Sequence, residues 1–255
     1  MKKWMILIGF LATIQQSAHA DEITLVADTW CPYSCDPSSD QPGILIEVAK
    51  IILEQAGHTV VYKEMNWARA IKEIKKGTFD GLVGAYKSDA PGFIFPAQPI
   101  MISQMSFFIS EDDPWKFEAY DDLKGRKISV INEYSYGKKF DAYIQKNSNK
   151  GDQTIQELSG ADATKRRIKL MALGRIDTIL EDWLVFPYEI KTHQEMAEFQ
   201  KFKSFKNAGN LLEAGSYIAF SPNKESSKLY ADLLSKGLQD LKASGKFEEI
   251  INKYK

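Results

Sequence analysis

A helix–glycine–strand pattern that occurs twice constrains the fold of this chain more than any other feature of the sequence. In its second copy, residues 168–183, apolar side chains recur at helical spacing up to Gly174, which can take the left-handed conformation that ends a helix. Residues 176–180 then indicate a short buried strand. Asp182 and Trp183 are therefore expected where that strand ends.

The first copy of the pattern is residues 71–86. Four positions align between the copies: Gly77 with Gly174, Phe79 with Ile176, Asp80 with Asp177, and Tyr86 with Trp183. The copies are too far apart for a solenoid, whose repeats recur about every 20 to 50 residues, so we predict two similar α/β lobes. Because ligands bind beyond the carboxyl ends of strands in open α/β sheets, both copies place their strand ends at a cleft between lobes. The alternative is that the pattern recurs by chance, because a helix, a glycine and a strand follow one another in many α/β proteins.

The first 20 residues have the pattern of a secretion signal. Lys2 and Lys3 precede an apolar run, 4–14, and residues 17–20 have small side chains at the two positions that a signal peptidase recognises. The apolar run is too short for a permanent membrane-spanning helix. We therefore expect cleavage after Ala20 and a mature protein in the periplasm.

The charge balance of the chain excludes some classes of partner. Lysine and arginine together number 33, and aspartate and glutamate 34, which leaves a formal net charge of −1 at pH 7. This balance provides no basic surface for a nucleic acid or an anionic membrane. We expect neither as a partner, and no cofactor.

Cys31 and Cys35 are the two cysteines of the chain. In an oxidising compartment a local disulfide is the first interpretation, and loop entropy for so short a ring amounts to about 2 kcal/mol. Free thiols and a redox pair are the alternatives, although redox cysteines normally have two residues between them rather than three. We expect no metal site, because neither His58 nor His193 lies near a cysteine in the sequence.

Aromatic residues follow the first two predicted strands. Trp30 and Tyr33 lie in the loop after the first strand, where a ring forms either a lid over the core or a platform for a ligand. Asn66 is the predicted N-cap of the first repeat's helix, which places Trp67 and Arg69 in its first turn. An arginine is unfavourable with the helix dipole there. Either a binding role or simple solvation explains it.

The remaining apolar runs complete an α/β pattern. Strands are predicted at 23–27, 59–62, 105–109, 127–131, 154–158 and 216–220, and helices at 43–57, 226–243 and 247–254. The acidic run 110–114 indicates a connection between lobes, and the chain is expected to cross back near 207–215. Ser135 is the predicted cap of a helix through Phe140 and Tyr143, whose free N–H groups are a ready anion site.

Taken in order, these motifs resemble those of the extracellular solute-binding proteins of family 3, the polar amino acid receptors of ABC importers. The resemblance covers residues 23–255 and depends on the order of several short motifs: Pro32-Tyr33, Gly43, Gly77 to Asp80, Leu123-Lys124-Gly125, Gly174 to Asp177 with Asp182, and Leu241 to Lys246. It implies an α/β periplasmic binding protein of two lobes, each with a mixed sheet, joined by two crossover strands. Lobe 1 is then 21–109 with 214–255, and lobe 2 is 110–213.

The resemblance also implies roles for particular residues. In the family, the acid at the position of Asp182 typically binds a ligand ammonium group. The segment that matches Tyr134 and Ser135 typically offers hydroxyl and N–H groups to the ligand carboxylate, and the aromatic residue matched by Tyr33 or Trp30 often stacks on the ligand. The lobes are expected to close by a hinge around a small solute. The protein is expected to act as a monomer that delivers this solute to an ABC importer.

The sequence departs from the family pattern where a ligand carboxylate is usually bound. Family members usually have an arginine shortly after the first repeat's strand, in a bidentate pair with that carboxylate, but residues 87–92 contain none. Arg69 is the best-placed substitute and Lys87 the second. Glu133 also stands where a small residue is usual.

These departures favour a cationic ligand, either an amine or a basic amino acid. Glu133 and Asp182 supply negative charge, and an aromatic-walled cleft supplies cation–π contacts. The wall is expected to include some of seven residues: Trp30, Tyr33, Trp67, Tyr86, Tyr134, Tyr136 and Trp183.

A receptor for a small solute is the leading hypothesis for function. One rival is an enzyme on the same scaffold, since some periplasmic dehydratases resemble this family and Glu133 or Asp182 can act as an acid or base. No nucleophile–base pair is evident in the sequence, so no catalytic residue is assigned. The other rival is a sensory protein that closes on a solute and docks on a membrane receptor.

Overall fold

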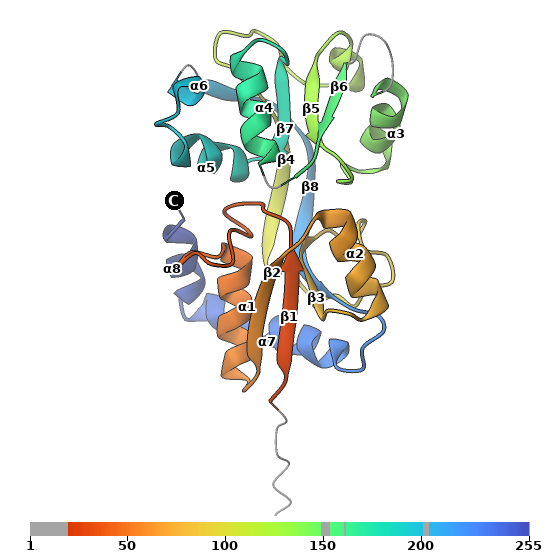
Figure 1. The fold of residues 1–255 in the computed structure, drawn as a ribbon, viewed down its shortest axis with the longest axis vertical. Coiled ribbons are helices and arrows are strands. Elements are labelled where there is room, and N and C mark those ends of the chain that lie inside the picture. The colour runs from red at the N-terminus through yellow and green to blue at the C-terminus, as the bar shows by residue number, and fades with distance from the viewer. Residues whose placement is uncertain (1–19, 149–153, 161, 201–203, 255) are drawn as a thin grey trace, which may run out of the picture.

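The computed structural model describes residues 20–148, 154–160, 162–200 and 204–254. Within them the chain forms two α/β lobes joined by two long strands, β4 (Met101–Ser110) and β8 (Phe205–Phe220), which cross the waist of the molecule in Figure 1. The strands lie in the order β2-β1-β3-β8-β4-β7-β5-β6, so the sheet continues from one lobe into the other. The predicted two-lobed α/β class is confirmed. The predicted secretion signal lies outside the described residues, apart from Ala20.

Lobe 1 is built on three strands: β1 (Glu22–Ala27), β2 (Thr59–Glu64) and β3 (Gly81–Ala85). The central strand, β1, is parallel to both of the others, whereas β3 is antiparallel to β8. Four helices flank these strands: α1 (Ile44–Gln55), α2 (Trp67–Lys76), α7 (Ser227–Ala243) and α8 (Lys246–Asn252). Because β1 lies at the centre of this layer, Ile23, Leu25 and Val26 are fully buried.

Lobe 2 repeats this plan with shorter elements. Its strands are β5 (Ile128–Ile131), β6 (Ile155–Leu158) and β7 (Thr178–Asp182). Here β5 is parallel to both β6 and β7, and β7 is antiparallel to β4. The helices are the 3₁₀ turn η1 (Tyr120–Leu123), α3 (Lys138–Asn147), α4 (Ala163–Ala172), α5 (Val185–Thr192) and α6 (Ala197–Gln200). None of the helices in the described residues is long and apolar enough to cross a membrane.

The two connecting strands form one antiparallel pair. Met101 of β4 pairs with Ser216 of β8, and Ser110 at the other end of β4 pairs with Phe205. The predicted lobe boundaries, 109/110 and 213/214, fall within this pair, so the chain changes lobe inside two adjacent strands. The boundaries themselves stay a prediction.

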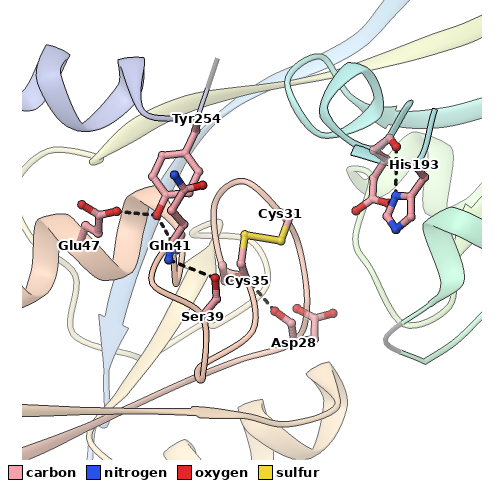
Figure 2. The surroundings of a disulfide bond; sticks show 11 residues. Asp28, Cys31, Cys35, Ser39, Gln41, Glu47, His193 and Tyr254 are labelled. Carbon is pink, nitrogen blue, oxygen red and sulfur yellow. Dashed lines mark hydrogen bonds and ion pairs between the residues drawn. A yellow bond between two sulfur atoms is a disulfide. The ribbon is translucent and has the colours of Figure 1, made fainter. Parts of the chain in front are cut away.

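The C-terminal end of the chain returns to lobe 1. The Tyr254 hydroxyl accepts a hydrogen bond from the backbone N–H of Gly43, at 2.9 Å, and donates one to the Glu47 carboxylate, at 2.6 Å. Lys253 forms an ion pair with the same carboxylate. Figure 2 shows Tyr254 and Glu47 close to the loop that follows β1. The end of α8 is therefore bound to the start of α1.

Both copies of the repeated pattern fold as helix, glycine and strand. Gly77 follows α2 with φ 84°, and Gly174 follows α4 with φ 65°, so each glycine takes the left-handed conformation that the sequence predicts. The second strand, β7, begins at Thr178, two residues later than expected. Asp182 is therefore the last residue of the strand, whereas the predicted strand ended at Leu180, before it.

The predicted cap of the third helix is wrong. Helix α3 begins at Lys138 with Gly137 as N-cap, and Ser135 lies outside it. Asp141, in the first turn, explains the shift, because its carboxylate accepts hydrogen bonds from the Ser135 hydroxyl, at 2.8 Å, and the Tyr136 N–H, at 2.7 Å. A carboxylate of the chain thus binds at the place where an anion site was expected.

Candidate functional site

A pocket lies between the lobes where β1 and β3 end. The space between its lining atoms, open solvent included, is about 330 Å³, and the enclosed cavity is far smaller, about 20 Å³. Four aromatic residues and two acids make up most of its wall: Trp30, Trp67, Tyr86, Tyr134, Asp28 and Asp89. Val83, Gly84, Met105 and Ser135 complete it. Such a pocket, apolar for the most part with a few polar groups, is typical of small-molecule sites.

The loop after β1 supplies Asp28 and Trp30, and a disulfide closes part of this loop. Cys31 and Cys35 are bonded, with their Cα atoms 4.8 Å apart, which confirms the structural disulfide (Figure 2). The N–H of Trp30, the residue just before this ring, donates to the carbonyl of Ser34 inside it at 2.7 Å. The loop is therefore a closed turn that presents the Trp30 ring to the cleft.

The start of α1 binds the same loop from behind. The N–H groups of Ile44 and Leu45 donate to the carbonyls of Pro32 and Tyr33, at 2.8 and 3.0 Å. These first-turn donors have no partner inside their own helix. A side chain at Gly43 would collide with the Tyr33 backbone, since a Cβ there lies 2.4 Å from its carbonyl oxygen. Only glycine permits this close packing.

Helix α2 contributes Trp67 from its first turn. The Asn66 side chain accepts a hydrogen bond from the Arg69 N–H at 3.3 Å, which confirms Asn66 as N-cap. Trp67 is buried and lines the pocket, whereas the Arg69 side chain is exposed and does not. The helix start therefore presents an aromatic ring, and not the arginine, to the cleft.

The residues after β3 form the next part of the wall. The Tyr86 N–H donates to an Asp89 carboxylate oxygen at 2.9 Å, which holds this acid beside the strand end. The Tyr86 hydroxyl lies 2.5 Å from the Ser103 hydroxyl on β4. Tyr86 is thereby fixed between its own strand end and a connecting strand.

Lobe 2 reaches the pocket through the loop between β5 and α3. The Tyr134 hydroxyl donates to the Asp28 carboxylate at 2.6 Å, and its ring packs edge-on against Trp67, with ring centres 5.8 Å apart. Glu133 takes φ 67°, which is uncommon for any residue except glycine. Its side chain is exposed, and the next two residues, Tyr134 and Ser135, line the pocket.

The end of β7 joins the lobes without lining the pocket. Asp182 is fully buried, and its carboxylate accepts four hydrogen bonds, from Tyr33, Ser103, and the backbone N–H groups of Gln104 and Leu184. The Tyr33 bond, 3.0 Å long, crosses from lobe 1 to lobe 2. The acid predicted to bind a ligand ammonium group thus has its acceptor positions occupied by the protein.

Glu181, the preceding residue, forms a second link between the lobes. Its carboxylate accepts a hydrogen bond from the Trp30 ring N–H, at 3.1 Å, and pairs with the fully buried Arg167 of α4. Thr164 also donates to it, at 3.3 Å. The buried charge pair of lobe 2 therefore holds the indole of a residue that lines the pocket from lobe 1.

The sequence of the chain matches the model of one protein family over residues 23–255, which is almost its whole length. That family is the bacterial extracellular solute-binding proteins, family 3. The chain belongs to this family. A comparison with curated proteins finds no match.

Solved structures confirm the periplasmic binding protein fold. A histidine kinase sensor domain with similarity to periplasmic binding proteins has 21% identity and a TM-score of 0.70, over 91% of this chain and 95% of that one. An ancestral arginine-binding protein bound to arginine has 18% identity and a TM-score of 0.69, over 91% and 97%. The substrate-binding protein of an amino acid ABC transporter has 17% identity and a TM-score of 0.68, over 91% and 98%.

Burial raises the pKa of Asp28, Asp89 and Asp182 in this solute-binding protein. It raises the pKa of Asp28 to about 7, although the Tyr134 hydrogen bond opposes the shift, and it raises the pKa of Asp89 to about 6. The pKa of Asp182 also rises to about 6, because burial outweighs its hydrogen bonds. In each case the low-dielectric surroundings disfavour the charged form. Two of these three groups, Asp28 and Asp89, line the pocket.

The solute-binding protein brings together five of the nine predicted ligand-binding residues: Trp30, Trp67, Tyr86, Tyr134 and Ser135. Tyr33 is buried behind Trp30, with ring centres 4.4 Å apart. Arg69, Asp182 and Trp183 do not line the pocket, and Trp183 is 47% exposed. Their roles in ligand binding stay predictions.

Sequence reasoning missed the two acids of the pocket. Asp28 directly follows β1, so the rule that singled out Asp182 at a strand end applies to it equally. Asp89 lies in residues 87–92, a segment that stands out in the sequence only for its lack of arginine. In the described residues no group of three or more histidine, cysteine, aspartate or glutamate side chains is placed to hold a metal ion. The polar chemistry of the pocket is thus that of two carboxylates and several hydroxyl groups.

Proposed function

We propose that this family member is a periplasmic receptor that closes its two lobes on a small polar solute, an amino acid or a related amine, and delivers it to an ABC importer. The observation that supports this most directly is the pocket between the lobes, whose wall comes from both of them. A solute held there contacts lobe 1 and lobe 2 at once. Its binding therefore favours the closed arrangement over an open one.

Contacts across the cleft support closure by a hinge. Outside the connecting strands, three side-chain hydrogen bonds join the lobes in the described residues: Tyr33 to Asp182, Trp30 to Glu181, and Tyr134 to Asp28. All of them lie beside the pocket, and β4 and β8 are the connections about which the lobes can rotate. The same hydrogen bonds are lost when the lobes separate, so ligand binding and lobe contact are coupled.

The test is a thermal-shift screen of the protein after co-purified solute has been removed by unfolding and refolding. The panel contains amino acids, polyamines, quaternary amines and carboxylates. A ligand at a hundred times its dissociation constant adds about 2.7 kcal/mol, which raises the melting temperature by several degrees for a chain of this size. A stoichiometric ligand that is recovered unchanged supports the receptor. Consumption of the ligand supports a dehydratase-like enzyme instead.

A sensory role is the second candidate, because a similar solved structure is a histidine kinase sensor domain. In that role the closed protein docks on a membrane receptor rather than on importer subunits. Uptake of the labelled ligand by cells with and without the protein separates the two. Loss of uptake supports transport, whereas unchanged uptake with a lost cellular response supports sensing.

A further inference from the structure

On the basis of the proposed receptor function, we infer that the pocket selects organic cations without a carboxylate, such as aliphatic diamines. Asp28 and Asp89 are the groups that bind the ammonium charge. This assignment narrows the proposed solute from an amino acid or amine to an amine without a carboxylate. It also gives the ammonium-binding role predicted for Asp182 to two other acids.

The charges of the pocket favour a cation and disfavour an acid. Asp28 and Asp89 are the charged residues of its wall, and none of its lining residues is lysine, arginine or histidine. Arg69 is exposed, and the Lys87 ammonium group lies over the ring of Tyr217, 5.2 Å from its centre. A ligand carboxylate in the pocket therefore meets two like charges and no cation to pair with.

Neither acid has a cationic partner among the described residues. Asp28 accepts its side-chain hydrogen bond from the neutral Tyr134 hydroxyl, and Asp89 accepts from the Tyr86 N–H and the Ser88 hydroxyl. Asp28 and Asp89 are half-buried, whereas the two fully buried acids of the cleft have partners, because Glu181 has Arg167 and Asp182 has four donors. Buried carboxylates are normally paired. Asp28 and Asp89 are the two that leave a place for a cation.

The raised pKa values agree with this reading. Burial raises the pKa of Asp28 to about 7 and that of Asp89 to about 6, because no cation of the protein offsets the cost of burying their charge. A bound ammonium group would supply that offset and return both groups to the ionised state.

The rest of the wall suits the same ligand. Trp30, Trp67, Tyr86 and Tyr134 place four aromatic rings around the acids, and such rings attract organic ammonium groups. Val83 and Met105 offer apolar surface to methylene groups. The start of α3, the predicted anion site, is occupied by Asp141. The described site thus has features for an ammonium group and an alkyl chain, and no cation for a carboxylate.

The decisive experiment compares cadaverine with lysine by isothermal titration calorimetry at pH 8. The two compounds have the same diamine chain and differ by the carboxylate of lysine. We expect cadaverine to bind at least tenfold more tightly. Lysine binding as tightly as cadaverine, or better, overturns the inference. If neither cadaverine nor lysine binds but an acidic or neutral solute does, the inference is overturned while the receptor function is supported. Binding of nothing in the panel overturns both.

Variants of the two acids test their assignment. Asp28→Asn and Asp89→Asn are each expected to weaken cadaverine binding tenfold or more. Asp40→Asn is the matched control, because it removes the same charge from an exposed position of lobe 1, and it should change affinity less than twofold. Without ligand, both pocket variants should melt at the same or a higher temperature than the parent at pH 8, because asparagine removes an unpaired charge from a half-buried position. Normal cadaverine affinity in the two variants overturns the assignment.

The pH dependence supplies an independent readout. Cadaverine binding needs ionised carboxylates, so its affinity should fall as the pH is lowered through 7 and 6, by up to about tenfold per unit for each required group. The free protein should respond in the opposite direction. Its folded state binds more protons than the unfolded chain in this range, so its stability should fall as the pH rises through 6 and 7. Affinity that is constant between pH 5 and 8 contradicts the inference.

Discussion

The two copies of the repeated pattern have the same order of elements but different tasks at their strand ends. In the first copy, Tyr86 follows β3 and lines the pocket, as does Asp89 three residues after the copy ends. In the second, Glu181 and Asp182 end β7 and hold Trp30 and Tyr33 of the opposite lobe. Trp183, the counterpart of Tyr86, is 47% exposed. The repeat thus predicts where aromatic and acidic groups gather, but the partner that each group finds determines whether it lines the pocket or joins the lobes.

The aligned aspartates of the two copies differ in the same way. Asp80 is 5% exposed, accepts a hydrogen bond from the Thr24 N–H at 2.8 Å and pairs with Lys224 at 2.6 Å. Asp177 is only partly buried and accepts one hydrogen bond, from the Lys127 N–H at 3.1 Å. Each carboxylate links its repeat to the backbone in or next to a neighbouring strand, β1 for Asp80 and β5 for Asp177. The first copy does so with a stronger, charge-assisted contact.

The largest effect on stability is expected from the buried ion pair between Arg167 and Glu181, which lies at the strand end of the second copy. Arg167→Met leaves the Glu181 carboxylate buried without its cation, so we expect a loss of about 3 to 5 kcal/mol in the free energy of unfolding, measured with urea. Arg167→Met combined with Glu181→Gln is the control, since it removes both charges and should recover most of the loss. A loss below about 1 kcal/mol in the single variant would show that the pair does not support this strand end.

The aligned aspartates give the next largest effect. Asp80→Asn should lower the free energy of unfolding by about 1 to 3 kcal/mol, because it removes the charge that pairs with Lys224 in a buried place. Asp177→Asn should cost about 1 kcal/mol or less, since an amide oxygen can still accept its one hydrogen bond. Both are measured by the same urea titration. Equal losses would mean that the two copies are energetically alike.

A smaller effect is expected where the second copy meets lobe 1. Tyr33→Phe removes the cross-lobe hydrogen bond to Asp182, which is worth about 1 kcal/mol, so the ratio of closed to open molecules should fall about fivefold. Small-angle X-ray scattering without ligand should then report a larger radius of gyration. Tyr143→Phe is the control, because its hydroxyl bonds to Leu123 within lobe 2. An equal change in both variants would argue against a link at Tyr33.

The smallest effect is expected at Trp183. Trp183→Ala should leave the affinity for the ligand found in the screen within twofold, because the side chain is half exposed and does not line the pocket. Tyr86→Ala, at the aligned position, should weaken binding tenfold or more. Titration calorimetry measures both. A large loss in the Trp183 variant would restore this residue to the binding site and make the two copies functionally alike.

The fold was predictable because it depends on local patterns that repeat along the chain. Apolar spacing placed the helices and strands, and Gly77 and Gly174 marked the helix ends through the left-handed conformation that glycine takes without a steric penalty. The position of the aromatic residues at the cleft was also predictable, because each follows a strand and the carboxyl ends of strands in an open sheet face the cleft. The cap at Ser135 was not, because Asp141 competes for the same donors.

The sequence by itself determined the two lobes, the disulfide loop and most of the aromatic wall, since each depends on neighbours in the chain or on a repeated period. Only the tertiary structure decided which carboxylates are paired within the protein. Asp182 meets donors from β4 and lobe 1, whereas Asp28 and Asp89 meet no cation in the described residues. Whether a carboxylate is paired depends on donors and cations that are distant in the sequence and become its neighbours only when the chain folds and the lobes pack together.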